Sequence, residues 1–483
     1  MDTETEKQSQ ASSLVAKAFS QTGLSALALL ALLVAAILNP ALWVQLVIAI
    51  AAVVGSHYLA GRLAKSVSEQ PHELQDQKSV KETQVDLAVR YWPVLSLVFS
   101  LLAVLISTGN GFDLSSALTV FSAGVLLTNS QTLAWVIPVG VSRSLKATKD
   151  LGVVIRSREA FEKLAKLNLA LFTKGGVLTN SPSEVESIKL STKSIFKDEK
   201  KILTLAASVE SLSKHVFAQA IVNSAKKSDL RITKPKDFRE IPGFGVEGTV
   251  TGKHVVVGSA ALLVQRNIRM EVQELIYADE STKSGISIVC VVVDGTLEAI
   301  MRFTDVVKPT SVNAVYQIAR ERIRVGLLTG DSSGTAQEKA DRVNISEVYA
   351  ELSPELKALF VAAQQDKGVL VGVIANPETD SLVLDKADVS ISLGSPVSDS
   401  IDINVPGNDP LKASEVIALS AQLRKKTNQG LGFAIGYGIT ALLGYVAIVS
   451  PLQVATPPAL TALLGSLSLL VVAMNAYSIG KLK

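Results

Sequence analysis

The sequence predicts a six-span α-helical membrane part joined to a large α/β part that contains a smaller α+β domain. Only 19% of the 483 residues are charged, against about 25% in an ordinary soluble protein. The charge-poor stretches are 22–60, 92–141 and 430–479, whereas 142–429 carries charges of both signs throughout. Short β-branched runs alternate with helical patterns in 142–429, which is typical of a mainly parallel sheet.

Each membrane span needs about 20 apolar residues, and six segments come close to that length. They form three hairpins, because each pair is separated by a short turn signal. The pairs are Thr22–Leu38 with Ala41–Ala60, Trp92–Ser107 with Leu114–Val141, and Leu431–Val449 with Ala459–Ser478.

Positively charged residues near span ends mark the cytoplasmic side, and here they all fall on one side of the predicted hairpins. These residues are Arg62, Lys65, Arg90, Arg143, Lys146, Arg424, Lys425, Lys426, Lys481 and Lys483. We therefore expect an integral, multi-pass protein of the plasma membrane, with the lipid bilayer as its first partner. Both termini and the large insert are expected to be cytoplasmic.

Three predicted strands of the insert end in polar loops. Leu167–Phe172 ends at Thr173, Arg324–Leu328 ends at Thr329, and Val369–Ile374 ends before Asn376. The carboxyl ends of parallel strands meet at one edge, where ligands of such sheets bind. The three loops should therefore converge on one site.

Composition excludes several other functions. The single cysteine, Cys290, lies in an apolar run and is predicted to be a buried strand residue, so disulfides and multi-cysteine metal sites are excluded. The four histidines are scattered, and no metal site is predicted from them. A net charge of +3 with mixed signs gives no indication of nucleic-acid binding.

The order of these parts, together with local motifs, resembles the P-type cation-transporting ATPases. Leu327-Leu-Thr-Gly-Asp331 is similar to the family's Thr-Gly-Asp loop, with Thr329, Gly330 and Asp331 in its positions. Ser353-Pro-Glu-Leu-Lys357 resembles the segment that supplies the family's phosphate-facing lysine. Phe303–Pro309 resembles the strand-to-helix joint where the chain re-enters the phosphorylation domain. The resemblance implies a HAD-like phosphorylation domain carrying a nucleotide-binding-type insert.

The resemblance is closest to the heavy-metal branch. Ser213-Lys-His215 is similar to its adenine signature, and Gly243 and Gly245 to its glycine pair. These residues are the implied nucleotide site, with ATP or ADP as the implied ligand. The implied domains are 1–62 (tail and first hairpin), 63–91 (cytoplasmic linker), 92–141 (second hairpin), 142–180 and 301–427 (phosphorylation-type domain), 181–300 (nucleotide-binding-type insert) and 428–483 (third hairpin).

The sequence departs from the family at the phosphorylated loop. The family reads Asp-Lys-Thr-Gly-Thr-Leu-Thr, whereas this chain reads Thr173-Lys-Gly-Gly-Val-Leu-Thr179. A carboxylate nucleophile gives an acyl phosphate that water can later remove, but a threonine would give a stable ester. Lys174 is retained, and we interpret Thr173 as the end of a strand rather than as a nucleophile.

A second departure concerns Mg²⁺, which prefers carboxylate oxygens. Asn376 stands where the family has a metal-binding aspartate, although Asp380 is retained. With Lys174 and Lys357 also retained, the pocket is expected to accept a phosphate without metal but to hold Mg²⁺-ATP poorly.

Two further departures lie in the linker and the membrane. Residues 63–91 leave no room for the family's actuator domain. Asn129, Ser130 and Gln131 replace the Cys-Pro-Cys motif of the fourth core span, so thiolate ligands for a soft metal are absent there. Without the proline, the helix break of the family is expected to be lost. These polar side chains form either interhelical hydrogen bonds or an altered binding site.

Three functions remain open from the sequence. The first is a catalytically inactive pseudo-ATPase that binds nucleotide and regulates or scaffolds a membrane protein partner. The second is an active cation pump with unusual residues, and the third a purely structural interaction protein. The four departures each remove a step of one reaction cycle, which favours the first.

Overall fold

A computed structural model describes residues 22–68, 80–128, 131–179, 184–213, 216–241, 244–283, 286–304, 307–394, 400–446 and 456–480. These residues divide into two compact units, one within 1–165 and 416–483 and the other within 166–415. The first unit is helical, and the second contains two β-sheets.

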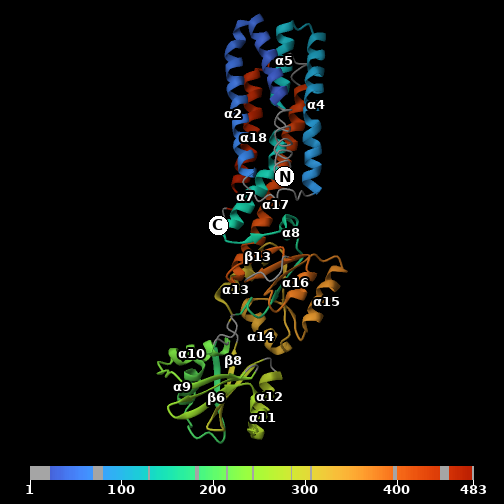
Figure 1. Ribbon diagram of the computed structural model, residues 1–483. Helices are drawn as coiled ribbons and strands as arrows, with labels where there is room; N and C mark the ends of the chain where they lie inside the picture. Colours follow the sequence, from blue (N-terminus) through green and yellow to red (C-terminus); the bar gives the residue numbers. More distant parts are fainter. Residues whose placement is uncertain are drawn as a thin grey trace, which may run out of the picture. The chain divides into compact units, whose positions relative to one another are not determined.

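The first unit is a bundle of long helices (Figure 1). Its elements are the helix Thr22–Leu38, η1 (Pro40–Leu42), α2 (Trp43–Ser68), α4 (Val80–Gly109), α5 (Leu114–Leu127), α6 (Gln131–Ala134), α7 (Val136–Asp150), β1 (Val154–Ile155), α8 (Arg158–Leu164), most of α17 (Pro410–Gly444) and α18 (Pro458–Tyr477).

Four helical stretches of the described chain are long and apolar enough to cross a membrane. They are Pro40–Ser68, Lys81–Gly109, Leu114–Asp150 and Pro458–Tyr477. The helix Thr22–Leu38 is apolar but shorter, and the apolar half of α17 is described as far as Val446.

Small and hydroxyl-bearing residues bring these helices together, as is common in membranes. Ser122 of α5 donates a 2.8 Å hydrogen bond to the carbonyl of Ala28, and Ser466 of α18 donates one of 2.9 Å to Ala52 of α2. A Cβ added at Gly465 of α18 would lie 2.4 Å from the carbonyl oxygen of Leu126. Glycine is therefore required where α18 meets α5.

One of the sequence expectations for this unit changes. The predicted span Leu114–Val141 is not one helix, because it is divided into α5, α6 and α7. Within the predicted linker 63–91, α2 continues to Ser68 and α4 begins at Val80, so residues 69–79, which are not described, separate the two helices.

The second unit contains a parallel sheet with strand order β13-β12-β11-β2-β9-β10. Its strands are β2 (Leu169–Thr173), β9 (Arg324–Leu328), β10 (Glu347–Tyr349), β11 (Val371–Ala375), β12 (Val389–Leu393) and β13 (Ile403–Val405). Helices α13 (Pro309–Arg320), α14 (Ser333–Val343), α15 (Pro354–Gln365) and α16 (Ser381–Lys386) surround it. Since β2 pairs with both β9 and β11, the predicted α/β fold is confirmed.

The remainder of the second unit is an antiparallel sheet with strand order β3-β8-β7-β6-β5-β4. Its strands are β3 (Glu184–Leu190), β4 (Lys236–Ile241), β5 (Gly245–Val250), β6 (Lys253–Gly258), β7 (Ser287–Val293) and β8 (Thr296–Thr304). Its helices are α9 (Glu199–Glu210), α10 (Val216–Lys227), α11 (Ala260–Gln265) and α12 (Val272–Lys283).

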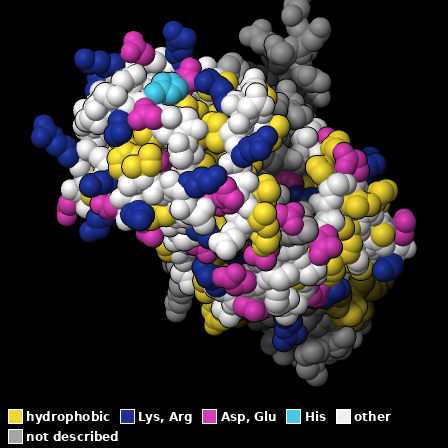
Figure 2. All heavy atoms as spheres, turned by 90° about the horizontal axis from the view of Figure 1, so that it is seen from below, with side chains coloured by type: hydrophobic (Ala, Val, Ile, Leu, Met, Phe, Trp, Pro, Cys, Tyr) yellow, Lys and Arg dark blue, Asp and Glu magenta, His cyan; other side chains and the backbone are white. Residues whose placement is uncertain are grey.

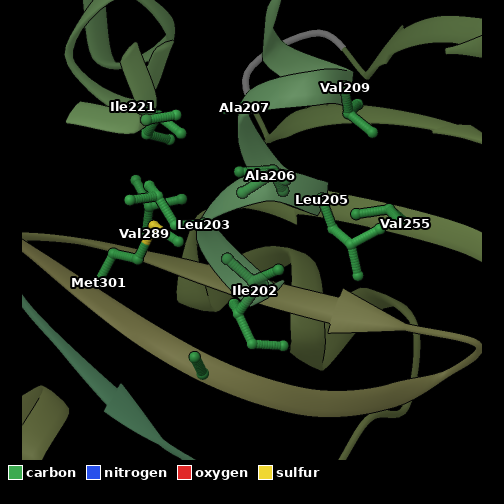
Figure 3. Packing of buried hydrophobic residues seen from close by; sticks show 14 of the residues in the cluster. Ile202, Leu203, Leu205, Ala206, Ala207, Val209, Ile221, Val255, Val289 and Met301 are labelled. Atoms are coloured by element: carbon green, nitrogen blue, oxygen red, sulfur yellow. The ribbon is translucent and has the colours of Figure 1, made fainter. Parts of the chain in front are cut away.

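The antiparallel sheet has a separate hydrophobic core on each face. On one face α9 and α10 cover the sheet, and Ile202 and Leu203 of α9 lie among residues such as Val289 and Met301 (Figure 3). On the other face α11 packs over Cys290, which is 1% exposed as predicted for a strand residue. Lysine, arginine and carboxylate side chains are interspersed on the outer surface seen in Figure 2.

Candidate functional site

The three polar loops predicted to converge do so at one edge of the parallel sheet. Strand β2 lies between β9 and β11, with Thr173 paired to Leu328 and Phe172 paired to Ile374. Thr173, Thr329 and Asn376 therefore stand at the carboxyl ends of three adjacent strands. This edge is where open parallel sheets bind their ligands.

Thr173 is a strand end, as predicted. It is the last residue of β2, its side chain is fully buried, and its Oγ1 atom has no hydrogen-bond partner. A buried hydroxyl without a partner is uncommon and costs about 1–3 kcal/mol. Thr329 is also buried, but its Oγ1 accepts a 3.2 Å hydrogen bond from the main chain of Asp331.

The two retained lysines are both engaged in ion pairs. The Lys174 Nζ atom lies 2.9 and 2.7 Å from the two carboxylate oxygens of Asp331. The Lys357 Nζ atom lies 2.7 Å from Oδ1 of Asp380, whose side chain is only 6% exposed. The structure thus brings together Lys174 with Asp331 and Lys357 with Asp380.

Asn376 packs on the loop that follows Thr173. A Cβ added at Gly176 would lie 3.0 Å from its Nδ2 atom, and Gly176 has a φ of +73° that favours glycine. The Asn376 Oδ1 atom accepts a 3.0 Å hydrogen bond from the main chain of Glu378. Asn376 therefore shapes the loop with an uncharged side chain.

Lys308 is a residue of this site that the sequence analysis did not single out. Its Nζ atom donates to the carbonyl oxygens of Gly176, at 2.6 Å, and Asn408, at 2.5 Å. Burial lowers the pKa of Lys308 to about 8, against the opposing effect of Asp409. The signal that could have revealed it is the strand-to-helix joint ending in Lys308-Pro309, because Pro309 begins α13.

The residues at this edge do not fit Mg²⁺. Mg²⁺ is bound through carboxylate and other oxygen ligands in near-octahedral geometry, whereas Thr173 and Asn376 are neutral and Asp331 and Asp380 are already paired with lysines. Within the described residues no group of three His, Cys, Asp or Glu side chains could hold a metal ion.

The predicted nucleotide site is only partly described. His215 and Gly243 lie outside the described residues. Gly245 has a φ of +152°, and a Cβ there would lie 2.1 Å from the carbonyl oxygen of Val257. The close pairing of β5 with β6 is therefore sufficient to explain Gly245.

Glu210 is a second residue that the sequence analysis did not single out. It ends α9, three residues before Ser213, and is 6% exposed. Burial raises its pKa to about 7, although a hydrogen bond from Ser213 opposes this shift, and its Oε2 atom has no hydrogen-bond partner. Glu210 lies on the apolar face of an amphipathic helix, and this position was the sequence signal that could have identified it. Buried carboxyl groups with raised pKa values are often found at binding sites.

The helix before the predicted polar site in the membrane ends just ahead of it, whereas the sequence predicted that the helix break of the family is lost. Helix α5 ends at Leu127, and Thr128 is non-helical with φ −93° and ψ 68° although no proline is present. Tyr437 of α17 donates a 2.7 Å hydrogen bond to the Leu127 carbonyl. The Tyr437 side chain thus satisfies a main-chain acceptor that the end of α5 leaves free, which stabilises the break.

The described polar groups at this break are hydroxyls, main-chain carbonyls and the amide of Gln131. Thr132 and Ser468 are buried and hydrogen-bonded at 2.6 Å, and Thr128 also bonds to Ser96. Gln131 is buried at the start of α6, while Asn129 and Ser130 lie outside the described residues. These oxygen donors do not match a soft metal, which prefers thiolate.

Comparison with known proteins finds a matching family profile and similar sequences. The family profile of haloacid dehalogenase-like hydrolases matches residues 167–373. The chain is 29% identical over 413 residues to "Copper-exporting P-type ATPase B" of Archaeoglobus fulgidus, covering 85% of this chain and 59% of the relative. It is 27% identical to "Probable copper-transporting P-type ATPase B" of Staphylococcus aureus, covering 85% and 61%.

The fold is also similar to that of a solved zinc-transporting PIB-type ATPase in the E2.Pi state. The TM-score is 0.62 at 22% sequence identity, and the match covers 87% of this chain and 67% of that structure. The chain spans about three-fifths of the length of the two curated relatives.

Proposed function

Because this chain is a homologue of the copper-exporting P-type ATPases and carries their HAD-like domain, we propose that it is a catalytically inactive member of that group. It is an integral membrane protein that keeps the ATPase fold without the ATPase cycle. Its termini and insert face the cytoplasm, and the membrane is the plasma membrane.

The observation that carries this proposal is the environment of Thr173. A hydroxyl must lose its proton to attack phosphorus, which requires a nearby general base. The described charged side chains at this edge include two lysine–aspartate ion pairs and Lys308, and the Thr173 hydroxyl makes no hydrogen bond to any of them. An ester formed there would also be stable, so the cycle would stop after one step.

The short connection between α2 and α4 supports the same conclusion. Only residues 69–79 separate the two helices, which is too little chain for an independent domain. No part of the chain at this point can therefore supply a dephosphorylating loop.

We propose that the antiparallel insert still binds ATP or ADP, without requiring Mg²⁺. The supporting observation is Glu210, whose buried carboxyl has an oxygen without a partner. An adenine amino group could donate a hydrogen bond to this unpaired oxygen. The protein would then regulate or scaffold a partner protein in the membrane according to whether nucleotide is bound.

Turnover and binding can be tested on the full chain in lipid nanodiscs. ATP hydrolysis with Mg²⁺ should be indistinguishable between the unmodified protein and Thr173→Ala, which defines the background. Calorimetry should show ATP or ADP binding that Mg²⁺ does not strengthen and that Glu210→Gln weakens, with Glu321→Gln as the exposed control. Hydrolysis above the Thr173→Ala background would refute the inactive assignment.

A further inference from the structure

At the edge formed by β2, β9 and β11, both carboxylates are paired with lysines, and Lys308 adds a third positive charge beside Gly176. Lys174 and Lys357 supply two positive charges, and Asp331 and Asp380 supply two negative charges within 3 Å of them. Thr173 and Asn376 add none. All four charged side chains are largely buried, at 15%, 13%, 12% and 6% exposure for Lys174, Asp331, Lys357 and Asp380.

This pairing explains why a divalent cation has no place at this edge. Adding two positive charges to a largely buried cluster that already holds three lysines would cost desolvation without a compensating carboxylate. Both oxygens of Asp331 already lie against Lys174, and the oxygens of Asp380 accept from Lys357 and Thr379, so each carboxylate is already engaged. The loop after Thr173 needs no ion to hold it, since Lys308 already donates to the carbonyl of Gly176.

The two neutral side chains are placed as neighbours. Phe172 pairs with Ile374, so Thr173 and Asn376 stand just beyond that pair on adjacent parallel strands. The side chain of Asn376 lies against Gly176, three residues after Thr173. The hydroxyl of Thr173 is fully buried and has no partner. Carboxylates at these two positions would share one small region.

We infer that two features of this edge go together: positions 173 and 376 carry no carboxylate ligands, and the edge requires no cation. The edge folds completely without a divalent cation, and two substitutions, Thr173→Asp and Asn376→Asp, convert it into a Mg²⁺ site. This inference deepens the proposed function, on which it rests, by describing how the inactive site remains stable.

The test is thermal unfolding of the full chain in detergent, with Mg²⁺ or with EDTA at matched ionic strength. The unmodified protein should unfold at the same temperature in both conditions. Thr173→Asp/Asn376→Asp should be destabilised in EDTA, because it places two unpaired negative charges close together, one of them at the fully buried position 173. Mg²⁺ should then raise its unfolding midpoint by about 3 °C or more, since binding stabilises the folded state.

Three further variants keep the test interpretable. Asn376→Asp alone changes charge but not shape, and should show a smaller shift in the same direction. Thr173→Asn tests shape without charge and should not respond to Mg²⁺. Asn313→Asp adds the same charge on the exposed face of α13 and should not respond either. If the double variant fails to fold, Asn376→Asp alone decides.

The outcomes separate this inference from the proposed function. A Mg²⁺-dependent midpoint in the unmodified protein would overturn the inference, yet leave the inactive assignment standing if hydrolysis is absent. Equal midpoints with and without Mg²⁺ in all the Asp variants would also overturn it. Hydrolysis by the unmodified protein would instead refute the proposed function.

Discussion

The hydroxyl of Tyr437 in α17 donates a 2.7 Å hydrogen bond to the carbonyl of Leu127, the last residue of α5. This bond satisfies a main-chain acceptor at the break between α5 and α6. A second side-chain bond, between Thr132 and Ser468, joins α6 to α18 just beyond the break. The break is therefore held by hydrogen bonds between helices.

Removing the Tyr437 hydroxyl should weaken the helical bundle. Tyr437→Phe leaves the Leu127 carbonyl without this donor, and we expect a loss of about 1 kcal/mol in the free energy of unfolding. Thermal unfolding in detergent measures it. Tyr58→Phe is the matched control, because Tyr58 is 67% exposed. Equal midpoints for the two variants would show that the bond contributes nothing.

Breaking the Lys357–Asp380 pair should be much more costly than breaking an exposed pair. Lys357→Met leaves Asp380 buried and unpaired, and should destabilise the protein by about 3 kcal/mol. Arg324→Met breaks an ion pair with Glu347 in which Arg324 is 52% exposed, and should cost less than about 1 kcal/mol. Chemical denaturation compares the two, and a similar cost for both would contradict the assignment of Lys357–Asp380 as a buried structural pair.

Glu210 should make the stability of the antiparallel domain depend on pH. Its pKa is about 7 in the folded protein, against an ordinary value of 4.5. Between these values the unfolded chain releases the proton first, so the free energy of unfolding falls as pH rises from 4.5 to 7, by up to about 3 kcal/mol. Glu210→Gln should remove that loss, whereas Glu321→Gln should keep it. Parallel curves for the unmodified protein and Glu210→Gln would refute the raised pKa.

Substituting Gly245 should disrupt the sheet rather than a ligand contact. A Cβ at this position meets the carbonyl oxygen of Val257 at 2.1 Å, so Gly245→Ala should separate β5 from β6 and unfold the domain at low temperature. Gly334→Ala, where a Cβ meets nothing within 4 Å, is the control. Circular dichroism follows both. A well-folded Gly245→Ala protein that had lost nucleotide binding would instead indicate a role in the ligand site.

Much of the fold was predictable because the periodic signals were strong. The β-branched run Arg324–Leu328 forms β9 with the predicted bounds, and Asn39 and Asp113 begin helical segments after the expected turns. In the membrane, the same apolarity hid the break at Thr128. Hydropathy cannot detect a break whose freed carbonyl is satisfied by a residue 310 positions away.

The candidate site was predictable in part for a similar reason. Strand ends placed Thr173 and Asn376 on one edge, since that follows from parallel topology. Lys308 and Glu210 were not identified, because their importance depends on burial and on contacts between distant segments. The bond from Lys308 to Gly176 spans 132 residues, and no local pattern encodes it.

The most direct test of the inactive assignment is the formation of a phosphorylated protein. The full chain in nanodiscs is incubated with γ-labelled ATP and Mg²⁺, quenched in acid, and compared with Thr173→Ala. The absence of a carboxylate nucleophile predicts no label above the Thr173→Ala background, with or without added copper or zinc ions. Acid-stable label that is lost in Thr173→Ala would contradict it, and would identify Thr173 as a phosphoryl acceptor.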